Sequence, residues 1–106
     1  MKEVKGMDVQ ELAYDFSVRI AEIVRYLKEE GQEFPLSGKL LDCGVGAGLA
    51  ARKNSRKQAA DCVKQADYIL EMAQKSGYLT ERQVKPTRGK GDALLRLLQG
   101  KAGTDD

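Results

Sequence analysis

The chain has 106 residues, of which 42% are apolar and 32% charged, a composition typical of one ordered globular domain. The formal net charge is only +2, so affinity for nucleic acid would have to come from a local patch. The sequence contains no His and no Cys-x-x-Cys pair, which argues against a zinc site or a histidine-bearing di-iron bundle. We therefore expect no metal and no cofactor, and we expect Cys43 and Cys62 to be reduced thiols packed as small hydrophobic groups.

The first ten residues lack the apolar core of a signal peptide, and no segment approaches membrane-spanning length. We therefore expect a cytoplasmic protein with no membrane partner. Residues 1–7 are predicted to be a mobile arm, residues 8–100 the folded domain, and residues 101–106 a mobile tail.

The first predicted helix covers approximately residues 8–30. Asp8 and Glu11 form a capping box at its start, and Gly31 is a natural stop. Its apolar residues recur at intervals of three or four, as one buried helix face requires: Leu12, Phe16, Ile20, Ile23 and Leu27.

The segment from Leu40 to Ala51 reads LLDCGVGAGLAA and has two interpretations. It could be a phosphate-binding loop, and it resembles the cofactor loop of class I methyltransferases. That loop must follow a buried strand within an α/β fold, and the rest of the chain offers too few strands. The favoured interpretation is a helix over residues 35–53, beginning at Pro35, whose small residues let a neighbouring helix approach closely. We expect close packing at Gly44 and Gly48, a bend or break in the same stretch, and a thin apolar stripe of Leu36, Leu40, Val45 and Leu49.

A third helix is predicted from a capping box of Ser55 and Gln58 up to Gly77. A fourth begins at Thr80, where Gln83 completes another capping box. Pro86, Gly89 and Gly91 then predict an interruption near Pro86–Gly91, because proline removes a backbone donor and glycine weakens a helix. The last segment, residues 92–99, is expected to bury four leucines: Leu94, Leu95, Leu97 and Leu98.

Small residues and leucines recur with a spacing that resembles a known bacterial family. The pattern is Leu36-Ser37-x-x-Leu40-Leu41-x-x-Gly44-x-x-x-Gly48, followed after a helix by Gly77-Tyr78-Leu79-Thr80. It is similar to the four-helix bundle proteins encoded in 23S ribosomal RNA intervening sequences, a family that includes the accessory variability determinant of diversity-generating retroelements. The resemblance implies an all-α, antiparallel up-down-up-down four-helix bundle. It also implies assembly into homo-oligomeric rings, typically pentamers, which in retroelements bind nucleic acid and associate with a reverse transcriptase.

Two clusters of basic residues are candidate nucleic-acid-binding sites. The first lies at the turn between the second and third helices, where a helix start could hold phosphate. The second lies in the predicted interruption of the fourth helix. Each could instead be an exposed turn whose charges serve solubility, and neither contains aromatic residues for base stacking. The first cluster is Arg52, Lys53, Arg56 and Lys57, and the second is Arg82, Lys85, Arg88 and Lys90.

No set of side chains points to catalysis. There is no His, and Cys43 stands beside Asp42 without the electropositive neighbour that would favour a thiolate. We therefore expect a non-catalytic protein that binds RNA or DNA through backbone contacts and serves as an accessory protein, with reverse transcriptase as a candidate partner. The alternative is a protein-binding adaptor ring without nucleic-acid affinity.

Overall fold

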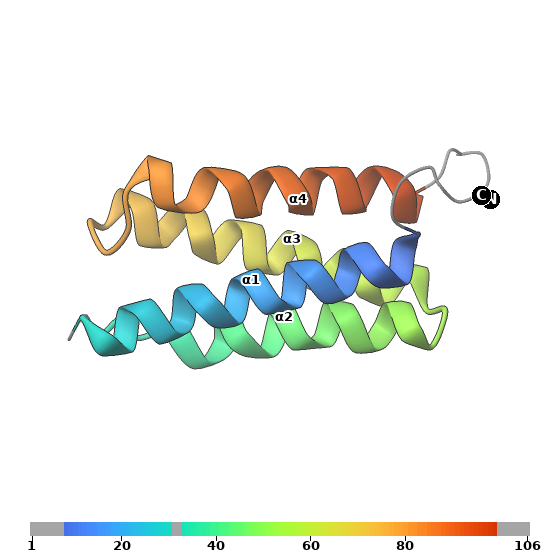
Figure 1. Cartoon of the computed structure of the whole chain (residues 1–106), viewed down its shortest axis with the longest axis horizontal. Helices are drawn as coiled ribbons and strands as arrows, with labels where there is room; N and C mark the ends of the chain where they lie inside the picture. Colours follow the sequence, from blue (N-terminus) through green and yellow to red (C-terminus); the bar gives the residue numbers. More distant parts are fainter. Residues whose placement is uncertain (1–7, 31–32, 100–106) are drawn as a thin grey trace.

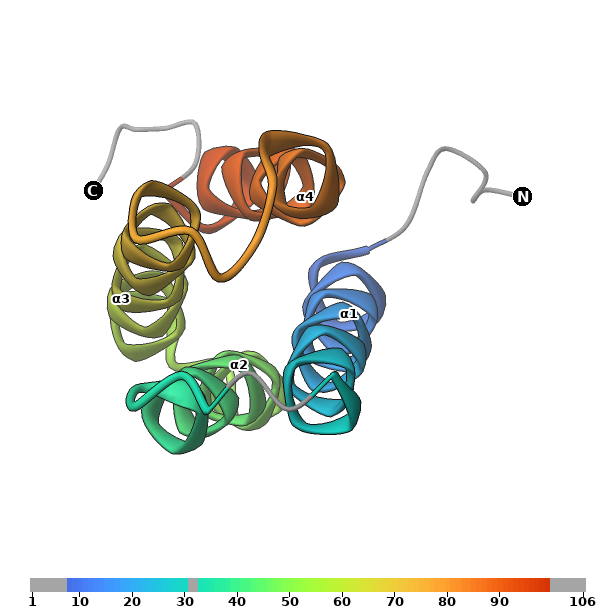
Figure 2. The same ribbon diagram turned by 90° about the vertical axis from the view of Figure 1, so that its left-hand side faces the viewer.

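The computed structural model describes residues 8–30 and 33–99, and the predicted arm (1–7) and tail (101–106) lie outside this described part. It contains four helices: α1 (Val9–Glu29), α2 (Ser37–Arg52), α3 (Arg56–Lys75) and α4 (Glu81–Gln99). Successive helices run in opposite directions (Figure 1). Seen end-on, they occupy the corners of a square in which α1 lies diagonally across from α3 (Figure 2). The prediction of an all-α up-down-up-down bundle is confirmed, and no strand occurs in residues 8–30 or 33–99.

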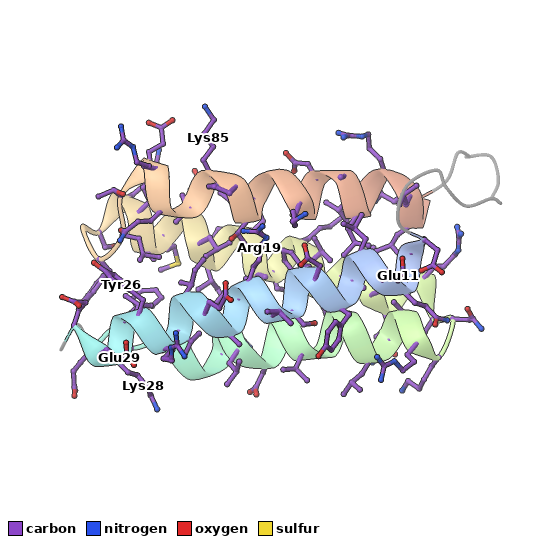
Figure 3. All side chains as sticks on the ribbon, viewed as in Figure 1. Glu11, Arg19, Tyr26, Lys28, Glu29 and Lys85 are labelled. Carbon is purple, nitrogen blue, oxygen red and sulfur yellow. The ribbon has the colours of Figure 1, made fainter. Side chains whose placement is uncertain are left out.

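The core is built mainly from aliphatic side chains. Charged side chains such as Lys28 on α1 and Lys85 on α4 project away from the bundle (Figure 3). At the end of the bundle where α4 begins, the rings of Phe34 and Tyr78 pack with centroids 4.9 Å apart. None of the helices in the described part is both long and apolar enough to cross a membrane. The largest fully buried side chains come from every helix: Phe16, Ile20, Leu27, Leu40, Leu70, Leu94, Val63 and Val84.

Helices α1 and α2 approach closely at two glycines of α2. A Cβ atom added at Gly44 would lie 2.7 Å from Cβ of Ile20, and one added at Gly48 would lie 2.6 Å from Oγ of Ser17. The Ser17 hydroxyl donates a hydrogen bond to the Gly44 carbonyl oxygen at 2.6 Å. The predicted close packing at Gly44 and Gly48 is therefore confirmed.

The predicted bend of the second helix is wrong, because α2 is continuous from Ser37 to Arg52. Its glycines are held between neighbours: Gly44 faces α1, and a Cβ at Gly46 would lie 3.0 Å from Sγ of Cys62 on α3. Contacts on both sides thus compensate for the low helix propensity of glycine. Because this segment is helical, the strand that a phosphate-binding loop needs is missing from it.

The start of α2 and its apolar stripe also differ from the prediction. Pro35 precedes the helix, in a turn closed by a hydrogen bond from the Ser37 amide to the Phe34 carbonyl oxygen at 3.1 Å. Leu40 is buried, but Val45 and Leu49 are 43% and 56% exposed. The glycines occupy the sides of α2 that face its neighbours, so the large residues of the second half point outward.

The predicted interruption near Pro86–Gly91 is wrong as well, since α4 is continuous from Glu81 to Gln99. Pro86 and Arg82 are both exposed, so water can satisfy the Arg82 carbonyl that proline leaves without a donor. A Cβ at Gly91 would lie 3.2 Å from the Phe16 ring, which makes this glycine a packing residue. Of the four leucines expected to be buried, Leu94 and Leu98 are buried, Leu95 is half-buried and Leu97 is 42% exposed.

The helix starts follow the predicted capping boxes in part. At α4, the backbone amide of Gln83 donates to Oγ1 of Thr80, and the backbone amide of Thr80 donates to Oε1 of Gln83. These two hydrogen bonds confirm that box. At α1 only half of the predicted box is present: the Asp8 carboxylate accepts a hydrogen bond from the Glu11 backbone amide, and the structure shows no return bond from the Asp8 amide to the Glu11 side chain. At α3 the prediction is wrong, because the Ser55 side chain makes no capping hydrogen bond. Main-chain hydrogen bonds to the end of α2 close this turn instead, including one from the Ser55 amide to the Ala50 carbonyl oxygen.

The glycine contacts predict opposite effects for two Gly-to-Ala substitutions. Gly44→Ala should destabilise the fold by about 1–3 kcal/mol, because the new methyl group would overlap Ile20. Gly89→Ala should stabilise it by up to about 1 kcal/mol, since a Cβ there meets nothing within 4 Å and alanine favours the helix. Urea unfolding of both variants measures the two free energies. Equal effects of the two substitutions would contradict the proposed contact.

Candidate nucleic-acid interface

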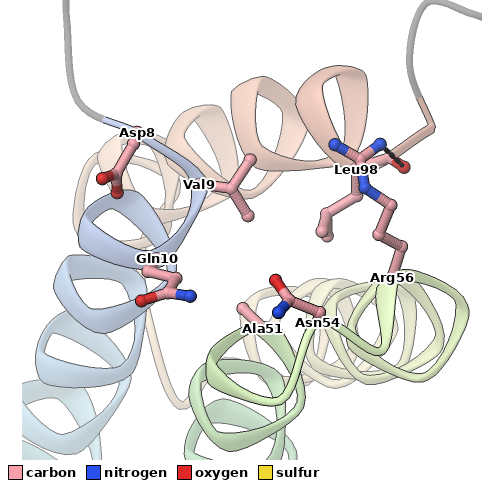
Figure 4. A pocket seen from close by; sticks show the side chains of 7 residues that line it. All are labelled: Asp8, Val9, Gln10, Ala51, Asn54, Arg56 and Leu98. Atoms are coloured by element: carbon pink, nitrogen blue, oxygen red, sulfur yellow. Dashed lines mark hydrogen bonds between the residues drawn. The ribbon is translucent and has the colours of Figure 1, made fainter. Parts of the chain in front are cut away.

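The first basic cluster lies at the end of the bundle where α2 meets α3, α1 begins and α4 ends. A pocket of about 360 Å³ opens at this end (Figure 4). Side chains from all four helices and from the α2–α3 turn line it: Asp8, Val9, Gln10, Ala51, Asn54, Arg56 and Leu98. Asn54 adopts the left-handed backbone conformation, with φ 62°, that lets the chain reverse here.

Arg56 is directed to the end of α4. Its guanidinium donates a hydrogen bond to the Leu98 carbonyl oxygen at 3.2 Å (Figure 4) and another to the Leu97 carbonyl oxygen at 3.5 Å. A cation at this position satisfies terminal carbonyl groups and interacts favourably with the negative end of the helix dipole. Arg56 therefore joins α3 to α4, and this structural role competes with phosphate binding.

Arg52 is directed to α1. Its guanidinium carbon lies 5.9 Å from the ring centroid of Tyr14, within the range of a cation–π contact. Like Arg56, it has a role inside the protomer, which the local sequence did not indicate because Tyr14 comes from another helix.

Lys53 and Lys57 remain the most available cations of the first cluster. Both are exposed, and neither forms an ion pair with a residue in the described part of the chain. They flank the start of α3, where the Ser55 side chain leaves the first amide groups without a cap. Uncapped amide groups and the positive end of a helix dipole favour an anion at such a position.

The second basic cluster does not form one surface. Arg88 makes a bidentate ion pair with Asp67 on α3, with distances of 2.7 and 3.0 Å, and this pairing raises the pKa of Arg88. Lys90 lies 2.9 Å from the Asp15 carboxylate on α1. Arg82 and Lys85 are exposed on the first turns of α4, where Lys85 projects away from the bundle (Figure 3).

The two cysteines are free and lie where α2 packs against α3. Burial raises the pKa of the Cys43 thiol and of the Cys62 thiol, which favours the protonated form of each. Within the residues that the structure describes, no group of three His, Cys, Asp or Glu side chains could hold a metal ion.

Fold and site together define an all-α four-helix bundle protein with a basic turn at one end. No family model matches the chain, and no curated protein matches it. A solved structure of a protein of unknown function from the S23 ribosomal protein family of Bacteroides thetaiotaomicron is similar, with a TM-score of 0.84 and 23% identity over 91% of this chain and 99% of that chain. At this level of identity the likeness shows the fold, and it does not single out the retroelement proteins.

The contact between Asp15 and Lys90 predicts a pH-dependent contribution to stability. The hydrogen bond from Lys90 lowers the pKa of Asp15 below its ordinary value of 3.8. A carboxyl group with a lowered pKa in the folded state adds stability above its unfolded pKa, and this contribution is lost as the pH falls through the folded pKa. Lys90→Met should therefore cost about 0.5–1 kcal/mol near pH 6, and much less near pH 2. Urea unfolding of the unmodified protein and of Lys90→Met, at both pH values, measures the difference in their free energies of unfolding. A difference that does not change with pH would refute the stabilising role assigned to the Asp15–Lys90 contact.

Proposed function

We propose that this protein is a non-catalytic, homo-oligomeric protein that binds RNA or DNA at the α2–α3 turn. The observation that carries the proposal is the pair of exposed lysines, Lys53 and Lys57, beside the uncapped start of α3. Ammonium groups and helix amide groups are both ligands for phosphate. The binding would therefore follow the nucleic-acid backbone, with little preference for base sequence.

Arg52 and Arg56 would add positive potential at this site without being its main ligands, because each already contacts another helix. Two available lysines bind a polyanion weakly on their own. An assembly that presents the same turn several times would hold several phosphates together, which raises the overall affinity without new contacts in each copy.

Self-association is the second part of the proposal. Large apolar side chains are exposed on α1, α2 and α3, and a second copy could cover them. The family resemblance favours five subunits, and it also supports a role as an accessory subunit of a reverse transcriptase in a diversity-generating retroelement. Light scattering at micromolar concentration should return a mass near five times that of the chain, and a monomer mass would contradict self-association.

Binding at the α2–α3 turn is tested by two variants with the same change in charge. Lys53→Glu with Lys57→Glu should reduce the affinity for both RNA and DNA by about tenfold or more at low salt. The matched control is Arg82→Glu with Lys85→Glu, two exposed cations at the opposite end of the bundle, which should keep most of the affinity. Fluorescence anisotropy with labelled oligonucleotides measures both.

Salt dependence separates phosphate contacts from other binding. The logarithm of the affinity should fall linearly with the logarithm of salt concentration, with a slope of about 0.7–0.9 per phosphate contact, and the lysine variant should have the smaller slope. Equal losses in both double variants would mean that net charge, and not this turn, determines binding. If the unmodified protein binds no nucleic acid at low salt, the adaptor alternative replaces this proposal.

A further inference from the structure

Four large apolar side chains are exposed together along the outer side of α1 and α2. They form the α1–α2 surface: Tyr14 (59% exposed), Val18 (36%), Val45 (43%) and Leu49 (56%). A groove of about 180 Å³ lies between the two helices, lined by Tyr14, Val45 and Leu49 together with Ser17, Gly48 and Arg52. The small residues Ser17 and Gly48 form the floor of this groove, and the larger side chains form its sides.

Within a single copy, the α2 part of this surface cannot be buried. Gly44 and Gly48 must face α1, because a Cβ at either position would overlap Ile20 or Ser17. Val45 and Leu49 are therefore turned away from the core. Monomeric proteins seldom expose a continuous apolar patch without a binding role for it.

A second, smaller apolar surface lies on α3. Tyr68 is 66% exposed and Met72 is 37% exposed, and the spacing of four residues places them on the same helix face. We name them the α3 pair. Cys62 packs against α2, and Asp67 reaches α4, so the α3 pair faces outward. Helix α3 lies diagonally across the bundle from α1, so the two apolar surfaces are on different faces (Figure 2).

We infer that the α1–α2 surface of one copy docks the α3 pair of the next copy, in a repeated head-to-tail contact. This inference rests on the proposed self-association and is independent of nucleic-acid binding. A two-fold contact would use one surface twice and leave the other exposed. A head-to-tail contact uses both surfaces in every copy, and it closes into a ring when the rotation between copies allows.

Charge and spacing support the same pairing. Arg52 follows Val45 by seven residues on α2, and the exposed Asp61 precedes Tyr68 by seven residues on α3, so each charge lies about 10 Å along the helix from its apolar residue. In a ring whose axis runs along the bundle, all copies point the same way, and α2 of one copy is antiparallel to α3 of the next. The cation at the end of α2 and the anion near the start of α3 then lie at the same end of the contact.

Two single variants, alone and mixed, test the inference. Leu49→Glu removes the α1–α2 surface and keeps the α3 pair, while Tyr68→Glu does the reverse. Light scattering should return a monomer mass for each, with the helicity of the unmodified protein. An equimolar mixture should form a one-to-one dimer, because only one intact contact can form between the two variants. Leu97→Glu, an exposed leucine outside both surfaces, is the control and should keep the full assembly.

A charge exchange tests the contact with less disturbance of the surface. Arg52→Glu and Asp61→Arg should each raise the dissociation constant of the assembly by about tenfold, and the double variant should return to within about threefold of the unmodified protein. Recovery in the double variant would support the pairing even if a glutamate at Leu49 or Tyr68 impaired folding.

Several results would overturn the inference. These are a monomeric unmodified protein, full assembly of the folded Leu49→Glu or Tyr68→Glu variant, or a mixture of the two monomeric variants that stays monomeric. Dissociation of Leu97→Glu to monomers would also count against it, because it would show that any exposed leucine has the same effect. Nucleic-acid binding is measured separately, so its absence would refute the proposed function and leave the docking result intact.

Discussion

The close contact between α1 and α2 is the constraint on which the rest of this fold depends. Gly44 and Gly48 allow the backbone of α2 to approach Ile20 and Ser17 without a Cβ between them. The Ser17 hydroxyl then donates to the Gly44 carbonyl oxygen at 2.6 Å, a polar contact between helices that fixes how the two are aligned. Because helix surfaces interdigitate only in certain relative positions, this contact also fixes which residues of α2 reach the core.

The same constraint explains the outer surface of the protein. A helix that turns its glycines toward its neighbours must turn its larger residues away from them, and in α2 these are Val45 and Leu49. The exposed apolar surface is thus a consequence of the internal packing. The small residues that let α1 and α2 pack closely therefore leave the adjacent large residues of α2, Val45 and Leu49, exposed.

The basic residues fall into two sets, those paired with a carboxylate and those without such a partner among the described residues. Arg88 and Lys90 are paired with carboxylates on α3 and α1, and they attach α4 to the bundle. Lys53 and Lys57 have no such carboxylate partner among the described residues. A net charge of only +2 is therefore compatible with a local anion site, because several of the cations have their charge compensated within the fold.

The sequence by itself determined the four helices, the capping box of Thr80 and Gln83, and the close packing at Gly44 and Gly48, because these depend on local periodicity and residue size. It did not determine that α2 and α4 are continuous. Relative to alanine, glycine destabilises a helix by up to about 1 kcal/mol and proline by about 3 kcal/mol. Contacts with other helices or with solvent decide whether the helix continues through such residues. Nor did it show which cations are paired, since Asp15 and Asp67 lie on other helices. Only the tertiary structure decides such contacts, because it brings residues together that are far apart along the chain.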